Sequence, residues 1–179
     1  MKEYLLKGYV LNKDRTLITN ENYINLVNKV NSIDTRLSSI EKHEMKKEMI
    51  FFDGEMFDAK TFISNIIFQA ETSIILIDPY VDLNTLDYLK NKKKGTREDV
   101  YCSSKSKISK KDVNLFNKQY GDLFIHDLTN YHDRFLIIDG EKLYHLGTSL
   151  NYAGKKVFVI SKIESKEILD CIKRSLKNE

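Results

Sequence analysis

The residues best suited to chemistry lie in the stretch from Tyr131 to Asn151. His132, Arg134 and Asp139 follow one another there with the spacing H-x-R-x4-D. On a β-strand, side chains two positions apart project from the same face, so we expect the imidazole and the guanidinium to point together. An imidazole attacks phosphorus or protonates a leaving oxygen, and a planar cation holds the non-bridging phosphate oxygens. The pattern therefore favours a phosphodiester substrate.

This spacing resembles the H-x-K-x4-D motif of the phospholipase D superfamily, whose members cleave phosphodiesters in lipids, DNA and RNA without a metal. In that superfamily a Gly-Ser-x-Asn element on the next strand supplies phosphate ligands. The segment Gly147-Thr-Ser-Leu-Asn151 stands in the corresponding place here. The resemblance implies phosphate contacts from Thr148, Ser149 and Asn151, and it implies neither a metal nor a cofactor.

The resemblance also implies a mechanism in which His132 forms a covalent phosphohistidine and Asp139 supports the motif electrostatically. A second histidine then acts as general acid, and the superfamily takes it from a second motif in the same chain or from a symmetry mate. This chain has one motif, because His43, His126 and His145 lack the downstream partners. We therefore expect a two-fold homodimer with both motifs at the interface.

Two departures from the superfamily pattern leave two functions open. Arg134 replaces the lysine and keeps its charge but not its ability to lose a proton. The hairpin between Asp139 and Ser149 is longer than usual. The first function is a nuclease, favoured over a lipase because basic loops accompany the motif. The second is a catalytically inactive module that binds phosphate or nucleic acid in a phage-related or virulence-related regulator.

Residues 49–164 more closely resemble the C-terminal region of RhuM-type and ORF6N-type proteins of bacterial virulence loci and prophages. The resemblance rests on the segments FDAKTFISNII, SIILIDPYVD and YHDRFLIIDGEKLYHLGTSLNYAGKKVFVISKIE. Full-length members of that group carry an N-terminal part regarded as DNA-binding, which has no visible equivalent in the first 48 residues here. The chain is thus expected to be a shortened relative or a natural fragment.

A structural alternative exists for the histidine and the arginine of the motif. Asp133 or Asp127 is near enough in the sequence to hold His132 and Arg134 in a buried polar network with no ligand. The motif context favours a phosphate-binding or catalytic pocket over this network.

Three polar residues follow a predicted central strand at its carboxyl end, where open α/β sheets place their ligands. They are Asp78, Tyr80 and Asp82. Because Asp78-Pro79 is also what a turn uses, we favour a capped turn for these residues.

Two basic stretches, Lys90–Arg97 and Lys105–Lys111, have the clustered charge that grips a nucleic-acid backbone. A solvated helix end contains the same residues, so both interpretations stand. The candidate backbone contacts are Lys92, Lys93, Lys94, Lys105 and Lys107.

The first 48 residues are expected to form a tail followed by an amphipathic helix that begins after Thr19 or Asn20 and fades in Glu41–Glu48. Its apolar residues recur at alternating spacings of three and four, which is the a/d seam of a coiled coil. They are Tyr23, Leu26, Val30, Ile33, Leu37 and Ile40. A helix lying on its own domain has the same pattern. A pure dimerisation scaffold is a third interpretation of the chain.

Residues 49–179 alternate between strand and helix patterns, which predicts an α/β fold of the phospholipase D-like half-domain type, with a mixed β-sheet flanked by helices. Strands are expected at 49–52, 73–78, 99–102, 123–126, 134–139, 142–146 and 157–160. Helices are expected at 57–70, 83–90, 110–120 and 166–176.

Composition bounds these predictions. Hydrophobic residues make up 41% and charged residues 31% of 179 residues, and the formal net charge is only +3, so one ordinary globular core is expected. Two distant cysteines and no apparent secretory signal favour the cytoplasm. The longest apolar run, Ile74–Ile77, is far shorter than the roughly 18 residues of a membrane span, so we expect no membrane segment.

Overall fold

The computed structural model describes residues 9–11, 17–43 and 47–178. The chain divides into two compact units, residues 1–45 and residues 46–179, and each is described by itself. Among the described residues, no helix is long and apolar enough to cross a membrane.

The first unit contains a small antiparallel pair of strands, β1 (Tyr9–Leu11) and β2 (Leu17–Thr19), followed by the 24-residue helix α2 (Asn20–His43). The predicted helix start near Asn20 is confirmed, whereas strand β1 lies in a region for which the pattern predicted no element. The apolar seam of α2 is open to solvent, with between 50% and 60% of Tyr23, Leu26, Val30 and Ile33 exposed. The side chains of Leu37 and Ile40 lie outside the described residues.

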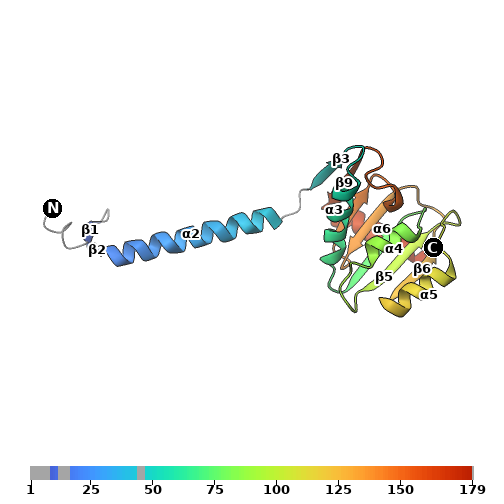
Figure 1. The fold of residues 1–179 in the computed structure, drawn as a ribbon, viewed down its shortest axis with the longest axis horizontal. Coiled ribbons are helices and arrows are strands. Elements are labelled where there is room, and N and C mark those ends of the chain that lie inside the picture. Colours follow the sequence, from blue (N-terminus) through green and yellow to red (C-terminus); the bar gives the residue numbers. More distant parts are fainter. Residues whose placement is uncertain (1–8, 12–16, 44–46, 179) are drawn as a thin grey trace. The chain divides into compact units, whose positions relative to one another are not determined.

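The second unit is built on a seven-stranded mixed sheet of order β3-β9-β8-β7-β4-β5-β6. Figure 1 labels β3, β9, β5 and β6 among its strands. Strands β4, β5 and β6 are parallel, and the remaining neighbours pair antiparallel, so the predicted mixed sheet is confirmed. The strands are β3 (Glu48–Phe51), β4 (Ser73–Ile77), β5 (Arg97–Cys102), β6 (Leu123–Asp127), β7 (Arg134–Ile138), β8 (Lys142–Leu146) and β9 (Phe158–Ile163).

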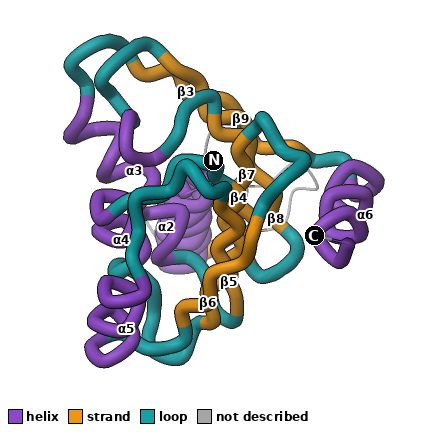
Figure 2. The backbone as a smooth tube through the Cα atoms, turned by 90° about the vertical axis from the view of Figure 1, so that its right-hand side faces the viewer, coloured by secondary structure: helices purple, strands orange, loops and turns teal. Residues whose placement is uncertain are grey.

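Helices cover both faces of this sheet, as Figure 2 shows, with α3, α4 and α5 on one side and α6 on the other. Short 3-10 turns, η1 (Leu150–Tyr152) and η2 (Leu176–Asn178), follow β8 and α6. The helices are α3 (Met56–Phe68), α4 (Leu83–Leu89), α5 (Lys110–Gln119) and α6 (Lys166–Ser175).

The core explains why β4 reads as a continuous apolar run. Its residues alternate between the two faces of the sheet, and both faces are covered. Ile74, Leu76 and Ile77 are fully buried. On the α6 side, Ile77 and Ile137 pack in one cluster with Leu169 and other apolar residues. The predicted buried strand is therefore confirmed, and it pairs with β5 on one side and with β7 on the other.

Candidate active site

The topology brings the chemical residues to one edge of the sheet, which we call the site edge. It comprises the carboxyl ends of the parallel strands β4, β5 and β6, the start of β7 and the end of β8. Ile77 of β4 pairs with Phe135 of β7, and Arg134 pairs with Leu146 of β8. Asp78 and Arg134 therefore adjoin each other at this edge. His132 precedes β7, and the segment 147–151 follows β8, so both also reach the site edge.

His132 lies in the loop between β6 and β7 and is exposed. The prediction that it shares a strand face with Arg134 is wrong, because β7 begins at Arg134 itself. Among the described residues, none forms a hydrogen bond with the imidazole. The ring is thus held by the loop alone and is open to a substrate.

Arg134 is half-buried at the first position of β7. Its guanidinium carbon lies 5.7 Å from the centre of the Tyr80 ring. Within the described part of the chain it has no ion pair, and its buried Nε has no hydrogen-bond partner. A cationic group in this state is suited to an anionic ligand, because a buried polar group without a partner is costly.

Asp78 interacts electrostatically with Arg134, yet its hydrogen bonds go elsewhere. Its side chain is fully buried. Oδ1 accepts from the Tyr80 N–H at 3.0 Å, while Oδ2 accepts from the Ser149 hydroxyl at 2.7 Å and from the Leu150 N–H at 3.0 Å. Burial raises the pKa of Asp78, and these hydrogen bonds and the charge of Arg134 only partly oppose the rise.

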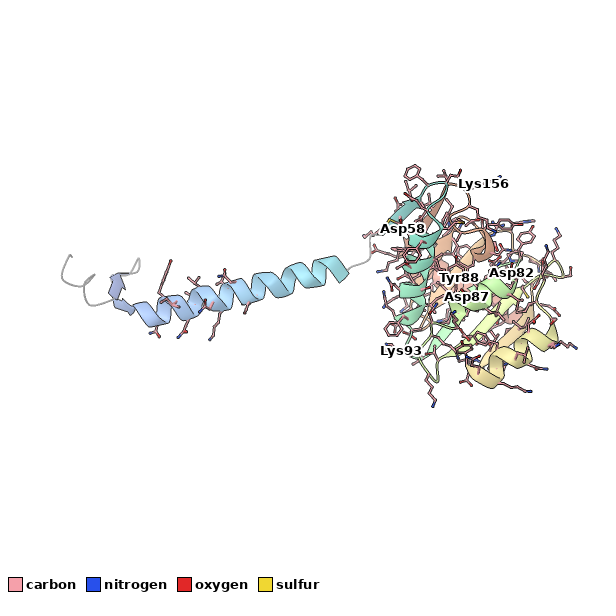
Figure 3. The ribbon with its side chains drawn as sticks, viewed as in Figure 1. Asp58, Asp82, Asp87, Tyr88, Lys93 and Lys156 are labelled. Carbon is pink, nitrogen blue, oxygen red and sulfur yellow. The ribbon has the colours of Figure 1, made fainter. Side chains whose placement is uncertain are left out.

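The predicted capped turn at residues 78–82 therefore accounts for only part of the observed structure. Asp78 does cap its own turn through Tyr80, and Asp82 caps α4 in a reciprocal capping box with Thr85. Figure 3 shows Asp82 at the start of that helix. What the pattern missed is the bond from Asp78 to Ser149. The available signal was the position of Asp78 at the carboxyl end of a buried strand.

The segment after β8 contains the three predicted phosphate ligands, and they differ in accessibility. Ser149 is only 2% exposed, and its hydroxyl already donates to Asp78. Asn151 donates through Nδ2 to the Tyr80 carbonyl at 3.1 Å, and its buried Oδ1 has no partner among the described residues. Thr148 is half-buried. Of the three, Thr148 is the side chain placed to contact a ligand without first breaking a bond.

Gly147 lets this segment come close to the neighbouring strand. A Cβ at this position would lie 2.8 Å from the Val159 carbonyl oxygen. The glycine is therefore required by the close approach of the chain after β8 to β9.

Asp139 lies at the opposite edge of the sheet, at the carboxyl end of β7. Arg134 is the first residue of β7 and Asp139 follows its last, so the two are roughly 16 Å apart along the strand. Its carboxylate accepts hydrogen bonds from the backbone N–H groups of Glu71, Thr72 and Ser73. This position corrects the prediction of an electrostatic role beside His132, because the carboxylate is fully engaged in fixing the connection from α3 to β4.

Those contacts change the titration of Asp139. Partial desolvation raises the pKa of its carboxyl, but the hydrogen bonds from the Thr72, Ser73 and Glu71 N–H groups outweigh it and lower the pKa to about 2. Charge-assisted bonds of this kind stabilise the ionised form. Asp139 is thus a positioning residue for the sheet.

The alternative of a buried network around His132 does not describe the observed geometry. His132 is exposed, and Asp133 approaches a different histidine, with 3.7 Å between its Oδ1 and His145 Nε2. Asp127 is exposed at the end of β6. His126 is hydrogen-bonded to Asp99 instead, at 2.8 Å.

The first basic stretch does not lie at the site edge. The prediction that Lys92 contacts a nucleic-acid backbone is wrong. Its side chain is 2% exposed, and its Nζ donates to the carbonyls of Thr96 and Gly121 at 2.6 and 2.8 Å. Lys93 is paired with Glu71, and Lys94 is exposed nearby. All three lysines precede β5 and therefore lie at the far edge with Asp139.

The second basic stretch follows β5 and reaches the site edge. Lys105 and Lys107 are exposed there. The loop that carries them is fixed to the segment beside Tyr80, because the Ser106 hydroxyl and the Lys107 N–H both donate to the Val81 carbonyl, at 3.0 and 2.8 Å. The two lysines add positive charge on the same side of the sheet as Arg134.

Comparison with solved structures identifies the fold. NucT from Helicobacter pylori superimposes with a TM-score of 0.54 and 14% identity, over 74% of this chain and 94% of NucT. TrmBL2, an archaeal chromatin protein with a novel mode of DNA binding, gives 0.49 and 13% over 89% of this chain and 64% of its own. Polyphosphate kinase from Porphyromonas gingivalis gives 0.47 and 10% over 75% and 23%.

The likeness to NucT shows that the second unit has a phospholipase D-like α/β fold, as the motif predicted. The other two likenesses are too weak to add to this. The sequence matches no protein-family model and no curated protein, so the resemblance to RhuM-type proteins stays a prediction.

Proposed function

We propose that this chain is a metal-independent phosphodiesterase, acting as a nuclease through a phosphohistidine at His132 in a homodimer. One observation carries the proposal: Arg134 is half-buried at the site edge with no ion pair among the described residues, and the exposed His132 precedes it by two residues. A guanidinium in this position offsets the charge of a phosphate, and a free imidazole attacks it.

In the proposed reaction, an imidazole nitrogen of His132 attacks phosphorus, a P–N bond forms, and the P–O bond to the leaving oxygen breaks. The leaving oxygen takes a proton from the imidazolium of the second copy's motif. Water then attacks phosphorus, the P–N bond breaks, and the proton of the water returns to that second imidazole. Arg134 and Thr148 hold the non-bridging oxygens during both steps.

The need for a second imidazole supports the homodimer. His126 is bonded to Asp99, and His145 lies on β8 beside Phe135, one position out of phase with Arg134. Alternate residues of a strand face opposite sides of the sheet. Since neither is placed to share a phosphate with His132, the acid is taken from a second copy.

The proposed substrate is a nucleic acid, which we infer from Lys105 and Lys107. Both are exposed at the site edge on a loop that is fixed by two hydrogen bonds to Val81. Lysines spaced beside a phosphate site neutralise neighbouring phosphates of a polymer. A small phosphodiester has no such neighbours, so its cleavage would not depend on these lysines.

A second function, binding without cleavage, is favoured by a specific observation. The Ser149 hydroxyl is committed to Asp78 and is only 2% exposed, and an arginine in place of lysine cannot give up a proton. A site with these two features still holds phosphate but has less means to move protons.

One assay separates the two functions. The protein is incubated with single-stranded and double-stranded DNA and RNA in EDTA, beside the His132→Ala and His145→Ala variants. Cleavage by the wild type and by His145→Ala, with none by His132→Ala, supports the phosphodiesterase. Binding in all three proteins with no cleavage in any would establish the binding module and reject the enzyme.

A further inference from the structure

Within the first unit, the helix α2 has an exposed apolar seam. Tyr23, Leu26, Val30 and Ile33 are each at least half exposed along one 24-residue helix. This helix is about 36 Å long. A continuous row of large apolar side chains in water is unfavourable by roughly 25 cal/mol for each Å². The seam therefore requires something to cover it.

The spacing of the seam specifies another helix as the cover. Apolar residues recur at steps of three, four, three, four and three, which assigns one unambiguous heptad register. Positions a are Tyr23, Val30 and Leu37, and positions d are Leu26, Ile33 and Ile40. Ile24 and Val27 widen this apolar face near the start of α2, but from Val30 onward it narrows to the a/d seam, whereas a helix that packs on a globular core has a broad apolar face along its whole length.

Charges beside the seam specify which helix. In this register the g positions carry Lys29 and Arg36, and the e positions carry Asp34 and Glu41. In a parallel pair of identical helices, each g residue faces the e residue five positions later on the other chain. Lys29 then meets Asp34, and Arg36 meets Glu41, so each charged contact joins opposite signs.

An antiparallel pair brings the opposite result. There g positions face g positions and e positions face e positions, so basic residues meet basic residues and acidic residues meet acidic ones. Like charges at these positions disfavour the pairing. The charge pattern thus selects one orientation as well as one partner.

We propose that α2 forms a parallel, in-register, two-stranded coiled coil with α2 of a second copy of this chain. The pairing stands whether or not the chain cleaves a phosphodiester. If it does, the carboxyl ends of the two helices meet at residue 43, just before the second unit begins, which raises the local concentration of one half-site around the other.

The first test measures the mass of the full chain in solution by light scattering over a concentration series, with two variants of equal charge. Ile33→Lys places a charge at a d position, and Ser32→Lys places the same charge at the outward c position. We expect the mass of two chains for the wild type and Ser32→Lys, and of one chain for Ile33→Lys. A one-chain or four-chain wild type would overturn the proposal, as would equal masses for the variants.

The Ile33→Lys result requires that the second unit stays folded, which thermal unfolding followed by circular dichroism verifies. Cleavage of DNA and RNA in EDTA is measured on the same samples. If the variant is folded and has the mass of one chain, its mass reports the loss of pairing and its cleavage rate reports catalysis. A failure of pairing is then distinguished from a failure of catalysis.

The second test measures orientation by disulfide formation in a Cys171→Ser background, since Cys171 is exposed and Cys102 is buried. Leu26→Cys lies at d, and in a parallel pair it adjoins its own copy. Asn28→Cys lies at the outward f position and is the matched control. We expect cross-linking of Leu26→Cys at least tenfold faster than of Asn28→Cys. Equal rates would contradict the parallel register.

Discussion

The Ser149 hydroxyl donates a 2.7 Å hydrogen bond to Oδ2 of Asp78 across 71 residues of the chain. Both residues are buried, and the same carboxylate oxygen accepts the Leu150 N–H at 3.0 Å. The bond ties the carboxyl end of β4 to the segment after β8. It therefore fixes the part of the site edge that contains Thr148 and Asn151.

Ser149→Ala is expected to destabilise the protein by about 1–3 kcal/mol, because it leaves a buried carboxylate with one fewer donor. Urea unfolding at neutral pH measures this, with Thr148→Ala as the neighbouring control, expected to lie within about 0.5 kcal/mol of the wild type. A stable Ser149→Ala protein that has lost phosphate binding would instead make the serine a ligand.

Asp139→Asn is expected to lower the free energy of unfolding by about 1–2 kcal/mol at pH 7, since charged acceptors bind the three N–H groups more strongly. The pKa of Asp139 is about 2, below its ordinary value of 3.8. The folded protein thus holds fewer protons between those values, so the stabilisation is present above about pH 4 and is lost as pH falls through 2.

Urea unfolding of the wild type and Asp139→Asn at a series of pH values from 7 to 2 tests this. The difference between the two proteins should shrink toward zero at the acid end. Asp133→Asn removes an exposed carboxylate and serves as the control. A difference that persists unchanged at pH 2 would show that charge is not the reason for the effect.

Glu98→Gln is expected to stabilise the protein above neutral pH. Burial raises the pKa of Glu98 from 4.5 to about 8, because Lys92 Nζ, at 3.5 Å, only partly compensates for the lost solvent. Between these pH values the folded state keeps a proton that the unfolded state releases, so stability falls as pH rises from about 4.5 to 8. Glutamine is neutral and removes this dependence.

Thermal unfolding from pH 5 to 9 measures the slope. The wild type should lose stability with rising pH more steeply than Glu98→Gln, and by pH 8 the variant should be the more stable by more than about 1 kcal/mol. Glu141→Gln, in an exposed turn, should follow the wild type. Parallel curves for wild type and Glu98→Gln would disprove the buried-proton explanation.

Arg134→Lys restores the residue of the phospholipase D motif and is expected to keep at least a tenth of wild-type cleavage. Arg134→Ala is expected to lose about a hundredfold or more in kcat, the usual effect of removing one electrostatic contact to the transition state. Steady-state kinetics on a DNA or RNA oligonucleotide compare the three proteins. Cleavage by Arg134→Ala at the wild-type rate would show that Arg134 has no role in the reaction.

The sequence predicts the elements well and their long-range contacts poorly. The apolar runs of β4 and the helical spacing of α6 are local patterns, and both are confirmed. The partner of Asp78 lies 71 residues away, and that of Asp139 lies more than 60 residues away. The pairing of β7 with β4 brings Asp139 to its partner, and the pairing of β8 with β7 brings Ser149 to Asp78. No local pattern indicates either pairing.

Lys92 and His132 also differ from their predicted positions, because contacts between distant parts of the chain place both residues. Lys92 looks like surface charge in a basic run, but Glu98 and the carbonyls of Thr96 and Gly121 bury its ammonium group. The spacing predicts His132 on a strand, but the strand begins two residues later, at Arg134, which pairs with Leu146, the last residue of β8. His132 and Arg134 reach the site edge in both descriptions, although by different elements, whereas Asp139 lies at the opposite edge.

The central claim is that His132 becomes covalently bound to phosphate. The direct measurement is to mix the protein with a 5′-labelled oligonucleotide in EDTA, stop the reaction in denaturant at alkaline pH, and locate the adduct by mass spectrometry of peptides. We predict a base-stable, acid-labile phosphoryl adduct on His132 that is absent from His132→Ala. Efficient cleavage without any such adduct, or an adduct on another residue, would contradict the mechanism.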